Sequence, residues 1–162
     1  MLETMKKNYL YGIMIILIII SIILGYFLYK QTNQYETVIQ NQYNLALYEL
    51  IDYVQDVENY LAKAMITSTP EHGAETLTKV WREANLAQVY LAQLPVSSTE
   101  LSNTAKFLNQ VSEYSYSLSR KNIYNEELTQ EELDNLKQLH DYSTELKNTL
   151  DQLYTDMNDR KN

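Results

Sequence analysis

The strongest hydrophobic feature of the chain is an uninterrupted apolar run near its amino terminus. Residues 9–29 read YLYGIMIILIIISIILGYFLY and include no charged side chain. At 1.5 Å per residue, a helix of this length extends roughly 30 Å, which matches the hydrocarbon thickness of a bilayer. Lys6, Lys7 and Lys30 flank the run. The pattern therefore predicts one transmembrane helix at 9–29, preceded by a cytoplasmic tail at 1–8.

A cleaved signal peptide is the alternative interpretation of this run. Signal peptides have shorter apolar regions followed by small residues at a cleavage site, and the residues KQTNQ that follow Tyr29 offer no such site. We therefore expect the run to be retained as an anchor. The chain after Lys30 contains 20 of the 21 acidic and 10 of the 13 basic residues. Lys6, Lys7 and the amino group lie before the run, against Glu3, whereas Lys30 and then a long acidic stretch follow it. Because basic residues close to a span favour the cytoplasmic side, we expect the amino terminus in the cytoplasm and residues 30–162 to be exported.

Four amphipathic helices are predicted after this run, at about 35–67, 70–94, 98–121 and 130–158. Apolar residues recur in them with the alternating spacing of four and three that buries one helix face. The first three faces comprise Tyr43, Leu47, Leu50, Val54, Val57, Leu61 and Ala64; Gly73, Leu77, Val80, Ala84, Ala87, Leu91 and Leu94; and Leu101, Leu108, Val111 and Leu118. The fourth comprises Leu136, Leu139, Ser143, Leu146, Leu150, Leu153 and Met157. Polar Thr104 and Ser115 interrupt the third face, which argues against tight packing there.

Capping residues separate the predicted helices. Ser68 and Thr69 precede Pro70, and the pairs Ser97 with Glu100 and Thr129 with Glu132 have the spacing of capping boxes. Short connections favour antiparallel neighbours. The predicted fold class is therefore all-α, with a single amino-terminal transmembrane helix followed by an antiparallel four-helix bundle. Self-association through the first amphipathic helix is the alternative use of its heptads, so a homo-oligomer is possible.

Composition narrows the classes of function. The 162 residues include no cysteine, three glycines and two prolines, and the net charge is -8. These counts exclude disulfides, thiolate metal sites and cysteine nucleophiles, and they argue against glycine-rich phosphate loops. The negative charge makes nucleic acid an unfavourable partner.

No set of residues predicts catalysis or a cofactor. His72 and His140 lack the additional ligands that a metal site needs. Glu49, Asp52 and Asp56 share one helix face, which we interpret as a solvated polar face. We therefore expect a protein that is not an enzyme and has no catalytic, cofactor-binding or metal-binding residues.

Aromatic side chains are the candidates for binding a partner. Trp81, the only tryptophan, adjoins the buried-face residue Val80. We interpret Trp81 as covering the edge of the core, with a partner-binding anchor as the alternative. Tyr114 and Tyr116 are two positions apart, so they point to different faces of the third helix, and one of them is a candidate for partner contact.

Four strings of the sequence are distinctive in combination and in order: ALYELIDYVQDVENYLAKAMITS (46–68), WREANLAQ (81–88), QLP (93–95) and KFLNQVSEYSYSLSRK (106–121). Together they resemble the amino-terminal part of the YpeB family of spore germination proteins. The resemblance implies a membrane-anchored, non-enzymatic companion of the cortex-lytic enzyme SleB, located in the inner spore membrane and facing the cortex. The resemblance assigns no functional role to any single residue of this chain. Trp81, Asn85, Tyr114 and Tyr116 are candidate contacts because of their chemistry within these strings.

Members of this family continue into a carboxy-terminal region with PepSY-type domains, which this chain lacks. The chain is therefore expected to be a fragment, a truncated reading frame or the product of a split gene. Two other functions remain open from the residues: a ligand-sensing four-helix domain of a receptor-like protein, and a self-associating membrane scaffold. A ligand-sensing domain normally passes its signal to a cytoplasmic output domain, and the eight residues before the predicted span are too few to form one.

Overall fold

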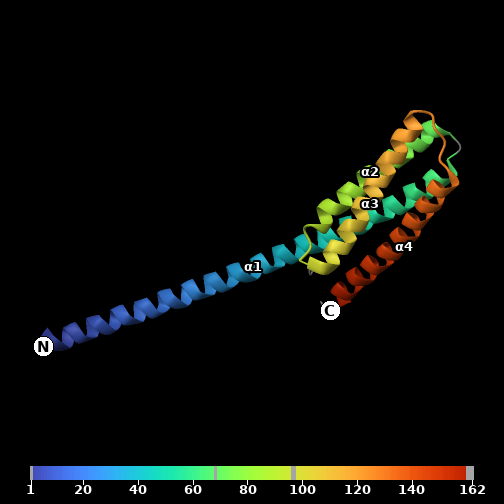
Figure 1. The fold of residues 1–162 in the computed structure, drawn as a ribbon. Coiled ribbons are helices and arrows are strands. Elements are labelled where there is room, and N and C mark those ends of the chain that lie inside the picture. The colour runs from blue at the N-terminus through green and yellow to red at the C-terminus, as the bar shows by residue number, and fades with distance from the viewer. Residues whose placement is uncertain (1, 68, 96–97, 160–162) are drawn as a thin grey trace. The chain divides into compact units, whose positions relative to one another are not determined.

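The computed structural model describes residues 2–67, 69–95 and 98–159. They form the helices α1 (Leu2–Ile66), α2 (Pro70–Leu91), α3 (Ser98–Ile123) and α4 (Gln130–Asp159), as Figure 1 shows. These described residues include no strand, which confirms the all-α prediction. The chain divides into two compact units, Met1–Gln42 and Tyr43–Asn162.

Within the unit Met1–Gln42, the described residues 2–42 form the first part of α1. The apolar side chains that the structure describes between Met14 and Ile39 are exposed. Within the described residues, no helix combines the length and the apolarity that crossing a bilayer requires. The side chains of residues 9–13, 15 and 16, which belong to the predicted span, lie outside the described set, as do those of the predicted tail at 1–8.

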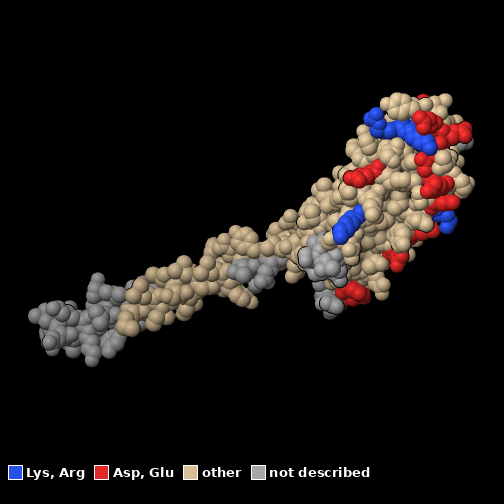
Figure 2. Space-filling view, in the orientation of Figure 1, with Lys and Arg blue, Asp and Glu red and all other residues tan. Residues whose placement is uncertain are grey.

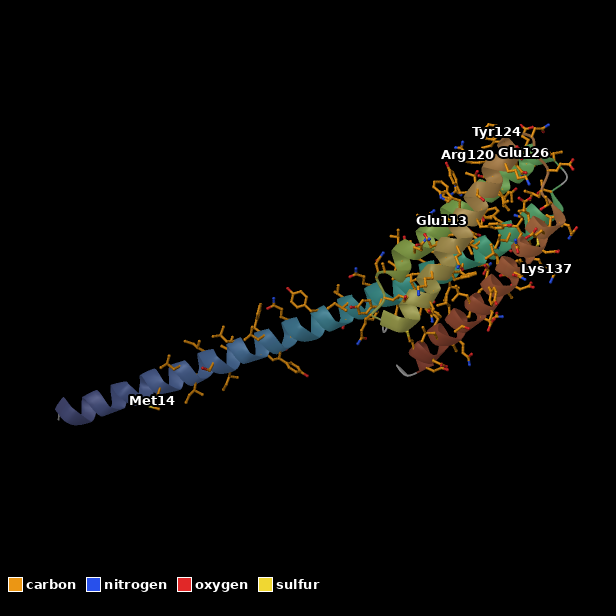
Figure 3. All side chains as sticks on the ribbon, viewed as in Figure 1. Met14, Glu113, Arg120, Tyr124, Glu126 and Lys137 are labelled. Atoms are coloured by element: carbon orange, nitrogen blue, oxygen red, sulfur yellow. The ribbon has the colours of Figure 1, made fainter. Side chains whose placement is uncertain are left out.

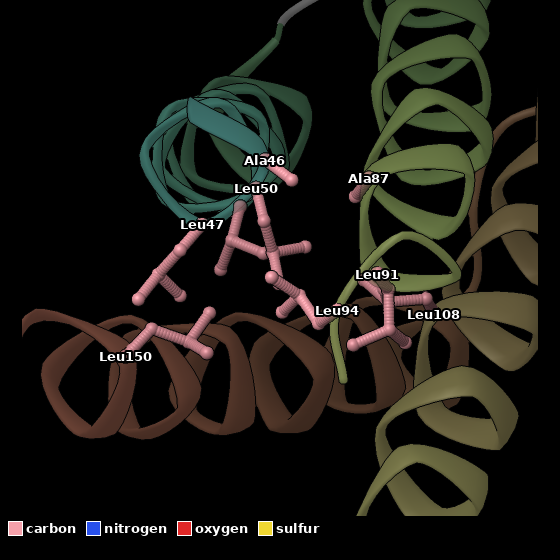
Figure 4. Packing of buried hydrophobic residues seen from close by; sticks show 9 residues of the cluster. Ala46, Leu47, Leu50, Ala87, Leu91, Leu94, Leu108 and Leu150 are labelled. Atoms are coloured by element: carbon pink, nitrogen blue, oxygen red, sulfur yellow. The ribbon is translucent and has the colours of Figure 1, made fainter. Parts of the chain in front are cut away.

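The unit Tyr43–Asn162 is built around two hydrophobic clusters. The first cluster contains Ala46, Leu47, Leu50, Val54, Ala87, Leu91, Leu94, Leu108 and Leu150, most of which Figure 4 labels. The second cluster contains Val57, Leu61, Ala64, Leu77, Val80, Ala84, Val111, Leu118 and Leu136. Both clusters draw residues from α1, α3 and α4 and from α2 or the turn after it. Burial of these apolar faces is the main free energy that favours the bundle.

The two clusters also reveal the direction of each helix. The first cluster takes residues 46–54 of α1, the end of α2, an early turn of α3 and a late turn of α4. The second takes residues 57–64 of α1, the beginning of α2, later turns of α3 and an early turn of α4. Consecutive helices therefore contribute opposite ends to the same cluster, so each helix runs antiparallel to the one before it. The heptads of α1 from Leu47 to Ala64 are buried within the chain itself.

The helix starts follow the predicted caps where the structure describes them. Thr69 is the N-cap of α2, with its hydroxyl accepting from the His72 N–H at 3.5 Å, and Pro70 is the first helical residue. At α4 the capping box is complete. The Glu132 N–H donates to Thr129 Oγ1 at 3.2 Å, and the Thr129 N–H donates to Glu132 Oε2 at 2.7 Å. Ser68, Ser97 and the side chain of Glu100 lie outside the described residues.

The end of α3 differs from the prediction. The helix continues past residue 121 to Ile123, and Asn125 then adopts a left-handed conformation with φ 63°. The Glu126 N–H donates to the Lys121 carbonyl at 3.2 Å and the Asn125 N–H donates to the Asn122 carbonyl at 2.9 Å. These two bonds form a Schellman motif, which satisfies the last helical carbonyls. Asn122, predicted to lie in the connection, is therefore a buried helical residue.

Two positions of the predicted buried faces also differ. Leu153 of α4 is 40% exposed, whereas Tyr154 and Met157 pack against the first cluster. Because an α-helix has 3.6 residues per turn and a heptad assumes 3.5, the buried face drifts to the next residue along a long helix. In α3, polar Ser115 is fully buried, and its Oγ has no hydrogen-bond partner among the residues that the structure describes. The side chain of Leu101 lies outside that set.

Candidate partner-binding surfaces

Trp81 and Tyr116 form an aromatic pair between α2 and α3. Their ring centroids are 5.6 Å apart and their planes are tilted by 40°. Trp81 is 39% exposed and Tyr116 is 44% exposed, and neither belongs to a hydrophobic cluster. Successive residues of a helix are about 100° apart, so the burial of Val80 turns Trp81 toward the surface. The placement of Trp81 at the edge of the core is thus only partly right, because much of its ring remains accessible.

The exposed pair continues along α3 toward the end of the helix. A hydrogen bond with Tyr116 is the main factor that raises the pKa of Arg120. Electrostatic interactions with Tyr124 and Tyr116 and a hydrogen bond with Tyr124 raise this pKa further. Arg120 Nη2 donates to the Tyr124 hydroxyl at 3.2 Å, and its guanidinium carbon lies 5.9 Å from the centre of that ring. Figure 3 labels Arg120 and Tyr124 at this end of the bundle. We call Trp81, Tyr116, Arg120 and Tyr124 the aromatic strip.

Asn85 lies one turn after Trp81 and connects α2 to α3. Its Nδ2 donates to the Trp81 carbonyl at 2.7 Å and to Ser112 Oγ at 2.8 Å. Asn85 is itself exposed, and its amide links α2 to α3 one turn away from the aromatic pair. The aromatic strip and Asn85 bring together three of the four predicted contact residues.

Tyr114, the fourth predicted contact residue, faces a different neighbour. Its hydroxyl accepts from Asn135 Nδ2 of α4 at 3.2 Å, and its ring packs against the second cluster. Tyr114 and Tyr116 thus point to different sides of α3, as their spacing predicts.

A groove that sequence reasoning missed runs between α3 and α4. Its volume is about 1020 Å³. It is lined by Asn103, Thr104, Phe107, Gln110, Glu113, Tyr114, Asn135, Gln138, Leu139, Tyr142, Glu145, Leu146 and Thr149. The signal in the sequence was the wide apolar face of α4, where Tyr142 lies beside Leu139 and Leu146 although the heptad pattern does not include it. We call this feature the α3–α4 groove.

The carboxylates of α1 meet a buried glutamate of α2. Burial is the main cause that raises the pKa of Asp56, and the charges of Asp52 and Glu83 raise it further. The charges of Lys63 and Arg82 lower this pKa but do not cancel the rise. Glu83 is only 4% exposed and accepts a hydrogen bond from Arg82 Nε at 3.0 Å. Among the described residues, no group of three or more histidine and carboxylate side chains is arranged to hold a metal ion.

The two histidines lie apart from these carboxylates. His72 is exposed near the start of α2. His140 Nδ1 is 3.3 Å from Asp141 Oδ1 on the surface of α4. Hydrogen bonds from His140 and Lys137 lower the pKa of Asp141. These contacts are local to each helix: His72 is exposed, and the side chain of His140 is 26% exposed.

Comparison with known proteins identifies the family. The family model described as YpeB N-terminal matches residues 31–162, which include the entire bundle. The chain belongs to the YpeB family. It is similar to the sporulation protein YpeB of Halalkalibacterium halodurans, with 31% identity over 149 residues, 90% of this chain and 33% of that protein. No solved structure matches the chain.

Two further YpeB relatives have the same relationship to the chain. The sporulation protein YpeB of Oceanobacillus iheyensis is 25% identical over 142 residues, 88% of this chain and 32% of that protein. That of Bacillus subtilis is 25% identical over 143 residues, 86% of this chain and 32% of that protein. The chain therefore spans about a third of the length of the curated relatives it matches. The names of these relatives describe sporulation proteins and indicate no catalytic family.

Proposed function

We propose that the chain is a membrane-anchored, non-enzymatic accessory protein of spore germination that holds the cortex-lytic enzyme SleB for the breakdown of cortex peptidoglycan. The observation that carries this proposal is the match of residues 31–162 to the YpeB family. The aromatic strip adds support, because partially exposed tryptophan, tyrosine and arginine side chains are enriched among residues that dominate protein interfaces.

The membrane anchor is the part of this proposal that rests on sequence. Residues 9–29 carry no charge and are flanked by lysines. Lys6 and Lys7 before the run outnumber the single Lys30 directly after it, which favours a cytoplasmic amino terminus. For a member of the YpeB family, this orientation corresponds to an inner spore membrane protein whose bundle faces the cortex.

The proposed mechanism requires no reacting group. A protein anchored in the membrane confines its partner to a thin layer beside the bilayer, which raises the effective concentration of the partner there. The four-helix bundle supplies a folded surface with side chains positioned by its core, so little ordering is needed when the partner binds.

Co-purification of SleB with the full chain from solubilised membranes tests the holding function. We expect SleB to be retained by the chain and to be lost when Trp81 is replaced by alanine. The matched control is Val89→Ala, which changes another exposed apolar residue of α2. Absence of SleB from the unaltered chain, with its helicity intact by circular dichroism, would contradict the proposal.

Accessibility labelling tests the orientation independently. The chain has no cysteine, so a single introduced cysteine reports on one position. We expect Glu126→Cys to react with a membrane-impermeant maleimide in intact cells, and Thr4→Cys to react only after the membrane is opened. The reverse pattern would refute the proposed topology.

A further inference from the structure

The α3–α4 groove has an apolar floor that the bundle leaves open. Phe107 meets Tyr142 edge-on across it, with ring centroids 6.1 Å apart. Tyr142 is 60% exposed, and Phe107, Leu139 and Leu146 are only partly buried although they pack against the clusters below. A molecule that binds in the groove would therefore remove aromatic and aliphatic surface from water, which gives a favourable free energy of binding.

The length of the groove matches a short helix. At one end, Asn135 Nδ2 bonds to the Tyr114 hydroxyl at 3.2 Å and joins α3 to α4. The lining residues on α3 extend from there back to Asn103. Along a helix, this stretch corresponds to roughly 16 Å, or about three turns. An amphipathic helix of that length presents three or four anchoring side chains, which is the usual pattern of helix-in-groove recognition.

The charge of the groove specifies the chemistry of that helix. Glu113 of α3 and Glu145 of α4 are the charged residues among those that line it, and the described lining includes no lysine or arginine. Two lysines of α4 pair with acids of their own helix. The Lys137 ammonium lies 3.2 Å from Asp141, and that of Lys147 lies 3.2 Å from Asp151.

Acidic side chains also follow α4 along the face seen in Figure 2. Lys106 precedes Phe107 on α3 and is not among the lining residues. The field at the groove is therefore set mainly by carboxylates, which favours a cationic partner.

We propose that the α3–α4 groove binds an amphipathic helix of another protein, one that has an apolar face flanked by lysine and arginine residues. This inference rests on the partner-holding function proposed above and adds a second contact surface, separate from the aromatic strip, and the chemistry of the helix that it binds. The apolar face of the bound helix covers Phe107, Leu139 and Tyr142, and its basic residues lie near Glu113 and Glu145.

A labelled model peptide tests this assignment. The probe is a helix of about 14 residues with leucines at the positions i, i+3, i+4 and i+7 and lysines elsewhere. A second peptide keeps the leucines and replaces every lysine by glutamate. Binding to the full chain in non-ionic detergent micelles is measured by fluorescence anisotropy, with empty micelles as the background. We expect the lysine peptide to bind at least about tenfold more tightly than the glutamate peptide.

Two pairs of variants locate the binding site. Glu113→Lys with Glu145→Lys reverses the charge of the groove. The control, Glu126→Lys with Glu127→Lys, makes the same change of net charge in the exposed connection before α4. We expect at least about a tenfold loss of affinity for the first pair and less than about a twofold change for the control.

Exposed tyrosines supply the second comparison. Tyr142→Ala removes part of the groove floor, whereas Tyr124→Ala removes an exposed ring on the aromatic strip. We expect only Tyr142→Ala to weaken the lysine peptide, again by about tenfold. The emission of Trp81 checks that each variant is folded.

The results separate this inference from the proposed function. Equal binding to the groove variants and their controls, or equal binding of both peptides, would overturn the groove assignment. If SleB nevertheless co-purifies with the chain, the holding function survives without it. If the peptide behaves as expected and SleB does not co-purify, the groove survives and the identity of the partner is wrong.

Discussion

Ser115 permits the sharpest test of the bundle core. It occupies a buried-face position of α3 with no exposed surface, and its hydroxyl lacks a hydrogen-bond partner among the described residues. Replacing Ser115 by alanine removes this hydroxyl and changes little else. Ser143→Ala is the matched control, because Ser143 of α4 is equally buried but its Oγ donates to the Leu139 carbonyl at 2.8 Å.

The expected change in the free energy of unfolding comes from three effects. An unsatisfied buried polar group costs about 1 to 3 kcal/mol, which Ser115→Ala recovers. Alanine also favours a helix over serine by roughly 0.5 kcal/mol. The void left by one oxygen costs only about 0.4 kcal/mol, at about 24 cal/mol per Å³. We therefore expect Ser115→Ala to stabilise the bundle by about 1 kcal/mol or more.

The control shares the helix preference and the void but gives up a hydrogen bond. That bond contributes about 1 kcal/mol, which offsets the gain in helix propensity. Ser143→Ala is thus expected to be neutral or slightly destabilising. The helix preference and the void cancel between the two variants, so their difference is the cost of the unsatisfied Ser115 hydroxyl plus the contribution of the Ser143 hydrogen bond.

Urea unfolding of the full chain in detergent, followed by Trp81 emission, measures this difference. Trp81 is the only tryptophan and contacts Tyr116 of α3, so its emission reports on packing between α2 and α3. For a slope of about 2 kcal/mol per molar urea, the midpoint of Ser115→Ala should rise by about 0.5 M. Equal midpoints for the two variants, or a lower midpoint for Ser115→Ala, would refute the reasoning.

Gly73, Glu132 and Leu91 give three further predictions about the stability of the chain. Gly73→Ala should destabilise the chain by about 1 kcal/mol because the new Cβ overlaps Asn122 Nδ2. In an Asn122→Ala background the same change should stabilise the chain by a similar amount through helix propensity. Urea unfolding of the unaltered chain, the two single variants and the double variant tests this change of sign, and additive effects would contradict it. Burial raises the pKa of Glu132, but hydrogen bonds from Lys121 and Thr129 outweigh it and lower the pKa below 4.5. Glu132→Gln should therefore lose about 1 kcal/mol at pH 7, and the loss should disappear as the pH falls from 4.5 through the lowered pKa of Glu132; a loss that persists in acid would show that the charge is not the cause. Leu91→Lys places an unpaired charge in the first cluster and should abolish folding, measured by circular dichroism, whereas Val89→Lys on the exposed side of α2 should leave it within about 0.5 kcal/mol.

Local sequence patterns predicted most of the helical framework. Pro70 after Thr69 and the Thr129–Glu132 capping box predicted where α2 and α4 begin, because caps depend on residues within one turn. The end of α3 was harder to predict from the sequence, since a Schellman motif with asparagine in place of glycine has a weak sequence signature. Its consequence, the burial of Asn122 against Gly73, required the neighbouring helix.

The candidate surfaces illustrate the same limit. The sequence suggested Trp81, Asn85, Tyr114 and Tyr116 without grouping them, because side chains 21 or more positions apart become neighbours only when helices pack. Packing joins Asn85 to Ser112 and Trp81 to Tyr116, and it directs Tyr114 toward Asn135. The α3–α4 groove had no counterpart in any single helix.

Periodicity, caps and the uncharged run at 9–29 were readable from the amino acids alone, because each depends on neighbours within a few residues. Tertiary packing decided which polar groups are buried without partners, which aromatic rings remain exposed, and where two helices leave an acidic groove. Those properties depend on the distance and rotation between helices. Such geometry results from the fit of complete faces, and no local pattern encodes it.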